Sequence, residues 1–396
     1  MNRWSSDGVA GWISSQARFL ATPEAALGEL CERLRSAGLD FDRAALFLGT
    51  LHPQYAGIEV RWTDGSAERF VGGFDIFEDP QFLDSPVAPI VNGIERTIRQ
   101  RIEPPNHNDG YPILRDLAKE GLTDYLIFSL PFSDGSHNAM SVVTRRPGGF
   151  TDHDLSEIDK LRHPIATVSE IFHLQRTAEN LMNAYVGPLS SRRVLAGQIQ
   201  RGDSELIDAV IWFSDLRNST HLGETLDAQA FLHLLNDYFE ATAGAVIAHG
   251  GEVLRFIGDA SLAVFPVPAQ SDRATARRAA CEAALAAAVA AEERAQNINQ
   301  IRRANREPVF HYGVGLHLGE VLYGNIGTPE RVEFSVIGAA ANLAARIEGL
   351  TKTAKRALVV SNAVAAELPN QPWESLGNFA LPGVADEVSL FGLDAT

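Results

Sequence analysis

The sequence has 396 residues, of which 45% are hydrophobic and 21% are charged, and its formal net charge at pH 7 is -16. A chain of this length and composition is not disordered and has the natural size of two domains with proper cores. Nucleic-acid-binding proteins normally carry a basic surface, so this balance excludes nucleic acid as the expected partner. An anionic ligand would need local cations or metal ions to neutralise its site.

The two cysteines, Cys31 and Cys281, lie far apart in segments with helical spacing. No disulfide framework or cysteine metal site is expected, and both are predicted to be small buried residues. The N-terminal segment lacks an unbroken apolar stretch of signal-peptide length. No run approaches the roughly 18 apolar residues of a membrane span. The sequence therefore predicts a soluble cytoplasmic protein without a membrane partner.

The first half of the chain predicts a mixed α+β domain. Residues 23–38 have the apolar spacing of a helix that stops at Gly38. The stretches RAALFLGTLH and GIEVRWTDG are typical of paired strands, and residues 124–146 are typical of a hairpin that turns at Ser133-Asp134-Gly135. The stretch FTDHDLSEIDKLRHPIATVSEIF predicts a closing helix, capped by Thr151 or Asp152, that Pro164 can kink.

This order of elements resembles a small-molecule-sensing domain of the GAF type, most closely in the last hairpin and the closing helix. The resemblance implies a sensor or regulatory domain over residues 1–164 with a small-molecule ligand. The alternative is a plain α+β dimerisation domain without a ligand. Residues 165–205 then form a helical connector that Gly187-Pro188 interrupts. The connector could transmit strain or dimer geometry, and the alternative is a passive spacer.

From residue 206 onward the sequence predicts a second α+β domain. Its expected elements, in chain order, are a buried strand (206–215), a long amphipathic helix stopping at Gly250 (226–251), a hairpin (250–265), an Ala-rich helix (274–305), two strands (309–327), and a turn with a third helix (335–350). This order favours a sandwich of ferredoxin-like type, with an antiparallel sheet and helices.

Two carboxylates lie where predicted strands end. Asp215 closes the strand LIDAVIWFSD, and Asp259 follows Gly258 at the tip of the hairpin. Gly-Asp between strands is also ordinary turn chemistry, which is the alternative. If the strands are neighbours, two like charges at one sheet edge raise a pKa or require a cation. Mg²⁺ or Mn²⁺ suits such oxygen ligands, and the backbone of LRNST could hold phosphate oxygens, so the edge predicts a metal–triphosphate site.

Asn342 and Arg346 are four residues apart on the third predicted helix and therefore share a face. Arginine can stabilise charge on a phosphate in the transition state, and asparagine can orient a ribose or a hydroxyl nucleophile. The alternative is a helix-surface pair without chemistry.

Four stretches, FSDLRNST, GGEVLRFIGDASLAVF, GVGLHLGEVLYGNIG and SVIGAAANLAARIE, occur in the order and spacing of the class III nucleotidyl cyclase catalytic domain. Residues 206–396 resemble that family. The resemblance implies that Asp215, Leu216 and Asp259 form the site of two divalent cations, Mg²⁺ or Mn²⁺. It also implies a homodimer, in which Asn342 and Arg346 act from the other subunit on the ribose and on the transition-state phosphate.

The resemblance assigns base selection to Arg255 and Ser335. Adenylate-forming members typically carry Lys, then Asp or Thr, and guanylate-forming members carry Glu and Cys. Arg255 keeps the cation and Ser335 keeps a hydroxyl, so ATP is the favoured substrate, although Arg is a wider, forked donor. The stretch FALPGVADEVSLFGL contains no Lys, whereas the family often supplies a phosphate-binding Lys there. The sequence thus predicts an adenylate cyclase that is regulated by its N-terminal domain, with weak activity or a substitute cation.

Two alternatives to an adenylate cyclase remain open, and a third can be rejected. The open alternatives are a guanylate cyclase and a weakly active or inactive nucleotide-binding or dimerisation module. Retention of Asp215, Asp259, Asn342 and Arg346 argues against the inactive module. The stretch GGEVL suggests a diguanylate cyclase, but the usual Gly-Gly-Asp/Glu-Glu-Phe run is absent and the two glycines end a helix.

Overall fold

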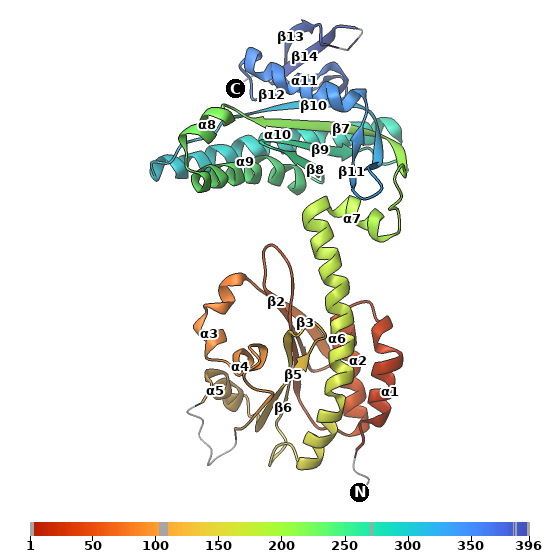
Figure 1. The fold of residues 1–396 in the computed structure, drawn as a ribbon, viewed down its shortest axis with the longest axis vertical. Coiled ribbons are helices and arrows are strands. Elements are labelled where there is room, and N and C mark those ends of the chain that lie inside the picture. The colour runs from red at the N-terminus through yellow and green to blue at the C-terminus, as the bar shows by residue number, and fades with distance from the viewer. Residues whose placement is uncertain (1–3, 103–109, 270–271, 383, 385, 394–396) are drawn as a thin grey trace. The chain divides into compact units, whose positions relative to one another are not determined.

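The computed structural model describes residues 4–102, 110–269, 272–382, 384 and 386–393 (Figure 1). The chain divides into two compact units, Met1–Ala184 and Tyr185–Thr396. Each unit combines a sheet with helices, which confirms the predicted α+β class. Within the described residues, no helix is both long enough and apolar enough to cross a membrane.

The first unit is built on a six-stranded antiparallel sheet with the order β3-β2-β1-β6-β5-β4 (Figure 1). Its strands are β1 (Arg43–Gly49), β2 (Gly57–Thr63), β3 (Ser66–Gly72), β4 (Thr97–Arg101), β5 (Asp124–Pro131) and β6 (His137–Thr144). The predicted pairing of β1 with β2 and the predicted β5–β6 hairpin are both confirmed. Gly135 has a φ of 85° in the hairpin turn, a conformation that glycine adopts without strain.

Helices cover both faces of this sheet. The first face packs on α1 (Asp7–Ser15), α2 (Pro23–Ala37) and α6 (Asp152–Val186), and the second on α4 (Val87–Val91) and α5 (Pro112–Lys119), with α3 (Pro80–Leu83) beside α4. Short 3₁₀ turns lie at Ala17–Phe19 and Phe74–Phe77. The Thr151 hydroxyl accepts the Asp154 N–H (3.2 Å), so Thr151 caps α6 as predicted.

Helix α6 runs through Pro164 and ends at Val186. Ile165, Val168 and Phe172 belong to the core of the first unit. The predicted boundary at residue 164 therefore lies inside this helix, and residues 165–184 of the predicted connector are part of the first unit.

The second unit contains an eight-stranded sheet with the order β13-β14-β12-β10-β7-β9-β8, and β11 pairs with β10 (Figure 1). The strands are β7 (Ser204–Leu216), β8 (Glu252–Ile257), β9 (Ala260–Pro266), β10 (Tyr312–Gly327), β11 (Val332–Ile337), β12 (Leu358–Ser361), β13 (Trp373–Phe379) and β14 (Val388–Leu393). The prediction of an antiparallel sheet is right only in part, because β12 is parallel to β10 and the sheet is therefore mixed. Parallel neighbours need a crossover, and the segment between these two strands contains the helix α11 (Ala339–Ala354).

The prediction of two strands over residues 309–327 is also wrong, because β10 is one strand of 16 residues. Its glycines do not form turns. A Cβ added to Gly315 would lie 2.4 Å from the Glu348 nitrogen, and one added to Gly319 would lie 2.8 Å from the Ala340 Cβ. Gly315 and Gly319 therefore allow α11 to pack directly on the strand.

The helices of the second unit also cover both faces of its sheet. They are α7 (Pro188–Leu195), α8 (Ser219–Thr225), α9 (Ala228–Ala248), α10 (Arg273–Ala304), α11 and α12 (Asn362–Ala365). Val210 and Trp212 of β7 pack with α9 and α10, whereas Ala209 and Ile211 face α11. Both cysteines are free and buried, as predicted.

A buried carboxylate attaches α7 to the sheet of the second unit. Glu252, 1% exposed at the start of β8, accepts hydrogen bonds from the Ser190 N–H (2.8 Å), the Ser190 hydroxyl (3.0 Å) and the Tyr323 hydroxyl (2.6 Å). A Cβ on Gly187 would lie 2.8 Å from Glu252 Oε1, and the φ of Gly187 is 85°. Gly187 is therefore required both by the backbone conformation and by this close approach.

Candidate active site

Asp215 and Asp259 lie at the same edge of the second sheet. In the register of β7 and β9, Asp215 is opposite Ala260, and the Leu216 N–H donates to the Asp259 carbonyl (3.2 Å). Gly258 has a φ of 64° and turns the hairpin so that Asp259 meets the end of β7. Burial and then the charge of Asp259 raise the pKa of Asp215 above its ordinary value. The two carboxylates predicted from the sequence are thus close neighbours.

This edge offers a divalent cation oxygen ligands. Two carboxylates that repel one another in a half-buried position favour a cation between them. The Leu216 side chain is apolar and 1% exposed, so Leu216 can contribute only its backbone carbonyl. No group of three or more His, Cys, Asp or Glu side chains suited to a metal is found in the described part of the chain. A cation would therefore depend on these two carboxylates, a carbonyl and oxygens of the substrate.

A buried ion pair lies beside the carboxylates and was not anticipated from the sequence. Arg217 Nη1 lies 3.1 Å from Glu348 Oε1, and Glu348 is 4% exposed. Burial raises the pKa of Glu348 to about 7, the Arg217 charge opposes that rise, and the Asp215 charge adds to it. A Cβ on Gly313 would lie 2.0 Å from Arg217 Nη2, so glycine is needed at this position. Lys352, which is exposed, adds a further positive charge that acts on Asp215.

The sequence did contain a signal for this pair. Arg217 is two residues after Asp215, and Glu348 is two residues after Arg346, within stretches already selected for their chemistry. Their contact depends on α11 lying across β10 and β7, which no local spacing indicates.

Asn342 and Arg346 lie on α11, which packs across β10. Helix α11 places Ala340 over Gly319 and the Glu348 backbone over Gly315, and the Glu348 side chain reaches Gly313. Gly313 is opposite Asp215 in the register, whereas Gly319 is opposite Ala209. A helix rises about 1.5 Å per residue, so Asn342 lies about 9 Å along α11 from Glu348, and Arg346 about 3 Å from it. Within the described residues, neither the Asn342 nor the Arg346 side chain has a hydrogen bond or ion pair.

Arg255 lies on β8, which pairs with β9, and Ser335 lies on β11, which pairs with β10, and the two strands contact each other. Arg255 is exposed, and its Nε lies 2.9 Å from Oε1 of Glu333. Ser335 is 3% exposed and follows Glu333 by two residues on β11, so both side chains are on the same face of that strand. Glu333 was not identified from the sequence, because only the tertiary contact between β8 and β11 brings it to Arg255.

Residues 203–393 match the protein family described as "Adenylate and Guanylate cyclase catalytic domain". Among curated proteins, the chain is similar to Adenylate cyclase 1 of Rhizobium meliloti (strain 1021), with 30% identity over 155 residues, 39% of this chain and 22% of that protein. It is also 29% identical to Adenylate cyclase of Anabaena cylindrica over 194 residues, 48% of this chain and 34% of that protein. The chain thus spans between about a fifth and a third of the length of these relatives.

Among solved structures, the chain is similar to the guanylyl cyclase Cya2, with 27% sequence identity and a TM-score of 0.41. The match covers 48% of this chain and 92% of that chain.

Proposed function

Residues 203–393 are a class III nucleotidyl cyclase catalytic domain, and we propose that the chain is an adenylate cyclase that converts ATP to 3′,5′-cyclic AMP and pyrophosphate. The observation that carries the proposal is the carboxylate pair Asp215–Asp259 at the edge of the sheet, with the pKa of Asp215 raised by burial and by Asp259. A perturbed carboxylate pair of this kind is typical of a functional site.

In the proposed reaction the ribose 3′ oxygen forms a bond to the α-phosphorus, the bond to the pyrophosphate oxygen breaks, and the hydroxyl proton leaves to solvent. Two divalent cations held by Asp215, Asp259 and the Leu216 carbonyl would lower the pKa of that hydroxyl and stabilise charge on the phosphates. The Asp215 and Asp259 carboxylates would hold those ions at the edge of the sheet.

Asn342 and Arg346 are proposed to act on the same nucleotide from a second copy of the chain. Their side chains have no hydrogen-bond or ion-pair partner among the described residues, which leaves both available to contact a ligand. A homodimer would bring the Asn342 amide to the ribose and the Arg346 guanidinium to the phosphate, where charge develops.

Adenine is the proposed base because Arg255 offers N–H donors and Ser335 a hydroxyl. Glu333 holds Arg255 through Nε, which leaves the Nη groups to donate to a ring nitrogen of adenine. The relatives named as adenylate cyclases, at 30% and 29% identity, support the same substrate. Arg217 and Lys352, whose charges act on Asp215, are proposed to supply the positive charge that the C-terminal stretch lacks.

Guanylate cyclase activity is the second candidate, and Glu333 is the observation that favours it. A carboxylate at the base site accepts hydrogen bonds from guanine N–H groups. Its ion pair with Arg255 opposes this role, because the carboxylate already has a cationic partner.

The first unit is proposed to be the regulatory domain, of the small-molecule-sensing type. A cavity of about 600 Å³ on its second sheet face supports this role. Phe47, Glu59, Arg61 and Tyr125 line it from the strands, and residues of α4 and α5 close it. A volume of this size falls in the range of ligand pockets.

The test is to incubate the purified full chain with ATP or GTP and with Mg²⁺ or Mn²⁺, and to identify the products by mass. We expect cyclic AMP and pyrophosphate, with a kcat/KM for ATP at least tenfold above that for GTP. Cyclic GMP as the main product would establish the second candidate, and no cyclic nucleotide from either substrate would refute both.

A further inference from the structure

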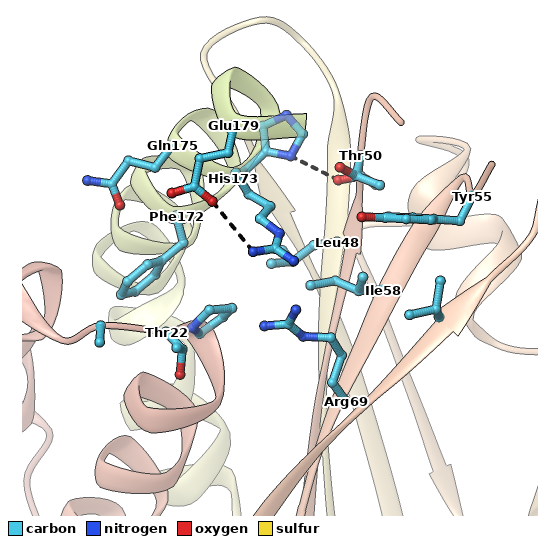
Figure 2. Close-up of a pocket in the computed structure, with 15 residues that line it drawn as sticks. Thr22, Leu48, Thr50, Tyr55, Ile58, Arg69, Phe172, His173, Gln175 and Glu179 are labelled. Atoms are coloured by element: carbon cyan, nitrogen blue, oxygen red, sulfur yellow. Dashed lines mark hydrogen bonds and ion pairs between the residues drawn. The ribbon is translucent and has the colours of Figure 1, made fainter. Parts of the chain in front are cut away.

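A second cavity lies in the first unit, between β1–β3 and α6 (Figure 2). Its volume is about 160 Å³. A single water molecule needs only about 10–15 Å³ of such space, so the cavity has room for a small molecule. Leu48 and Ile58 face this cavity, whereas their neighbours Phe47 and Glu59 face the larger one. Since alternate residues of a strand point to opposite faces, the sheet separates the two cavities.

The cavity combines an apolar wall with two arginines. Leu48, Ile58, Val71 and Phe172 supply apolar surface, and Arg69 reaches in from β3. Figure 2 shows the Arg69 guanidinium directed into the space between Thr22 and Ile58. This pattern suits a ligand with an apolar body and an anionic group.

Arg69 is held in an orientation that leaves donors for a ligand. Its Nε donates to Glu24 Oε1, and among the residues that the structure describes its two Nη atoms have no hydrogen-bond partner. The Arg69 side chain is 28% exposed, so its donors are partly withdrawn from solvent. A guanidinium fixed through Nε presents parallel N–H groups, which match the two oxygens of a carboxylate.

The second arginine is held only weakly. Arg176 Nη1 lies 3.5 Å from Glu179 Oε2, and their side chains are 50% and 51% exposed. An ion pair this long and this exposed contributes little, so a ligand carboxylate can displace Glu179. Arg176 belongs to α6, as do Phe172 and His173, whose Nδ1 lies 2.9 Å from the Gly49 carbonyl oxygen.

We propose that this cavity binds a small organic monocarboxylate. Its carboxylate lies between Arg69 and Arg176, and its apolar body packs on Leu48 and Ile58. Because Phe172 and Arg176 form one wall, the bound acid holds residues 172–179 of α6 against the sheet. The site is separate from the larger cavity and does not depend on the proposed cyclase activity.

The test measures direct binding to the full chain, both by calorimetry and by the NMR signals of the Leu48 and Ile58 methyl groups. The probes are benzoate and hexanoate, and benzamide is the neutral control with the body of benzoate. We expect at least one acid to bind with a Kd near or below about 1 mM, and benzamide to bind at least tenfold more weakly. Arg69→Gln and Arg176→Gln should each weaken acid binding by about tenfold, and the exposed Arg18→Gln control should not change it.

Several results would overturn the proposal. One is the absence of saturable binding by both acids, and another is benzamide binding as tightly as benzoate. Acid binding that survives both arginine substitutions, or that Arg61→Gln weakens instead, would place the ligand elsewhere. Because the readout is binding, failure of the cyclase assay would leave this result unaffected.

Discussion

Buried carboxylates occur in both units, and their surroundings differ. In the first unit, Asp154 is 3% exposed. It accepts hydrogen bonds from Trp4 Nε1 (2.8 Å), the Thr151 N–H (2.7 Å) and Arg146 Nη2 (2.5 Å). Burial raises the pKa of Asp154, but these partners more than offset it and bring that pKa down to about 2. In the second unit, Asp215 faces Asp259, and both burial and that neighbour raise its pKa.

The partners of a buried carboxylate therefore distinguish one that stabilises the fold from one that needs a ligand. Burial acts in the same direction at both sites, so the partners decide the outcome. Asp154 has its partners within the protein and anchors the start of α6 to the N-terminal segment through Trp4. Asp215 has a like charge as its neighbour, which the charges of Lys352 and Arg217 offset only in part, and this arrangement favours binding of a cation.

The largest expected effect is on catalysis. Asp259→Asn should lower the cyclase rate by about 10³-fold or more, since loss of a metal ligand removes several kcal/mol of charge stabilisation. The same change should not lower the thermal midpoint without metal, because it removes a repulsion. Rate measurements and thermal unfolding of one variant check both. A folded Asp259→Asn protein with a near-normal rate would show that Asp259 is no metal ligand.

The second prediction tests whether the site is shared between two chains. Mixing Asp215→Ala with Arg346→Ala chains should restore activity, to about a quarter of wild type if dimers form at random with one intact site in each mixed dimer. Asp215→Ala mixed with Asp259→Ala is the matched control and should stay inactive, because both changes affect the same half-site. No recovery, with mixed dimers observed by native mass spectrometry, would contradict a shared site.

The third prediction concerns the structural carboxylate. Asp154→Asn should lower the free energy of unfolding of the first unit by about 2–4 kcal/mol, because Arg146 loses its charged partner. Asp152→Asn, exposed in the same helical turn, is the control and should change it by only a few tenths of a kcal/mol. Denaturant unfolding measures both. Equal effects of the two substitutions would show that Asp154 stabilises the first unit no more than an exposed carboxylate does.

The same site predicts a pH dependence. The pKa of Asp154 falls from 3.8 to about 2 on folding, so its contribution of about 2 kcal/mol is present above pH 4 and is lost as the pH falls toward 2. The Asp154→Asn protein should lack this part of the acid sensitivity. An unchanged acid-unfolding profile would mean that other carboxylates dominate.

Sequence patterns predicted the local elements well and the long-range contacts poorly. The β5–β6 hairpin, α2 and the strand before Asp215 follow from turn residues and apolar periodicity, which act over a few residues. The single long β10 was misread because its glycines serve packing of α11, which is not a local property. The contacts of Arg217 with Glu348 and of Arg255 with Glu333 join segments far apart in the chain, so only the tertiary fold reveals them.

The smallest expected effect is on base selection, where a carboxylate has a cation as its partner. Arg255 and Glu333 are 42% and 46% exposed, and an ion pair this exposed contributes up to about 1 kcal/mol. Glu333→Gln should therefore lower kcat/KM for ATP by about fivefold, because Arg255 loses the contact that orients it. The kcat/KM for GTP should change little. Glu330→Gln, exposed in the turn before β11, is the matched control. Measuring kcat/KM for both nucleotides with one metal decides the role of Glu333: a loss confined to GTP would show that Glu333 reads guanine directly and does not serve to position Arg255.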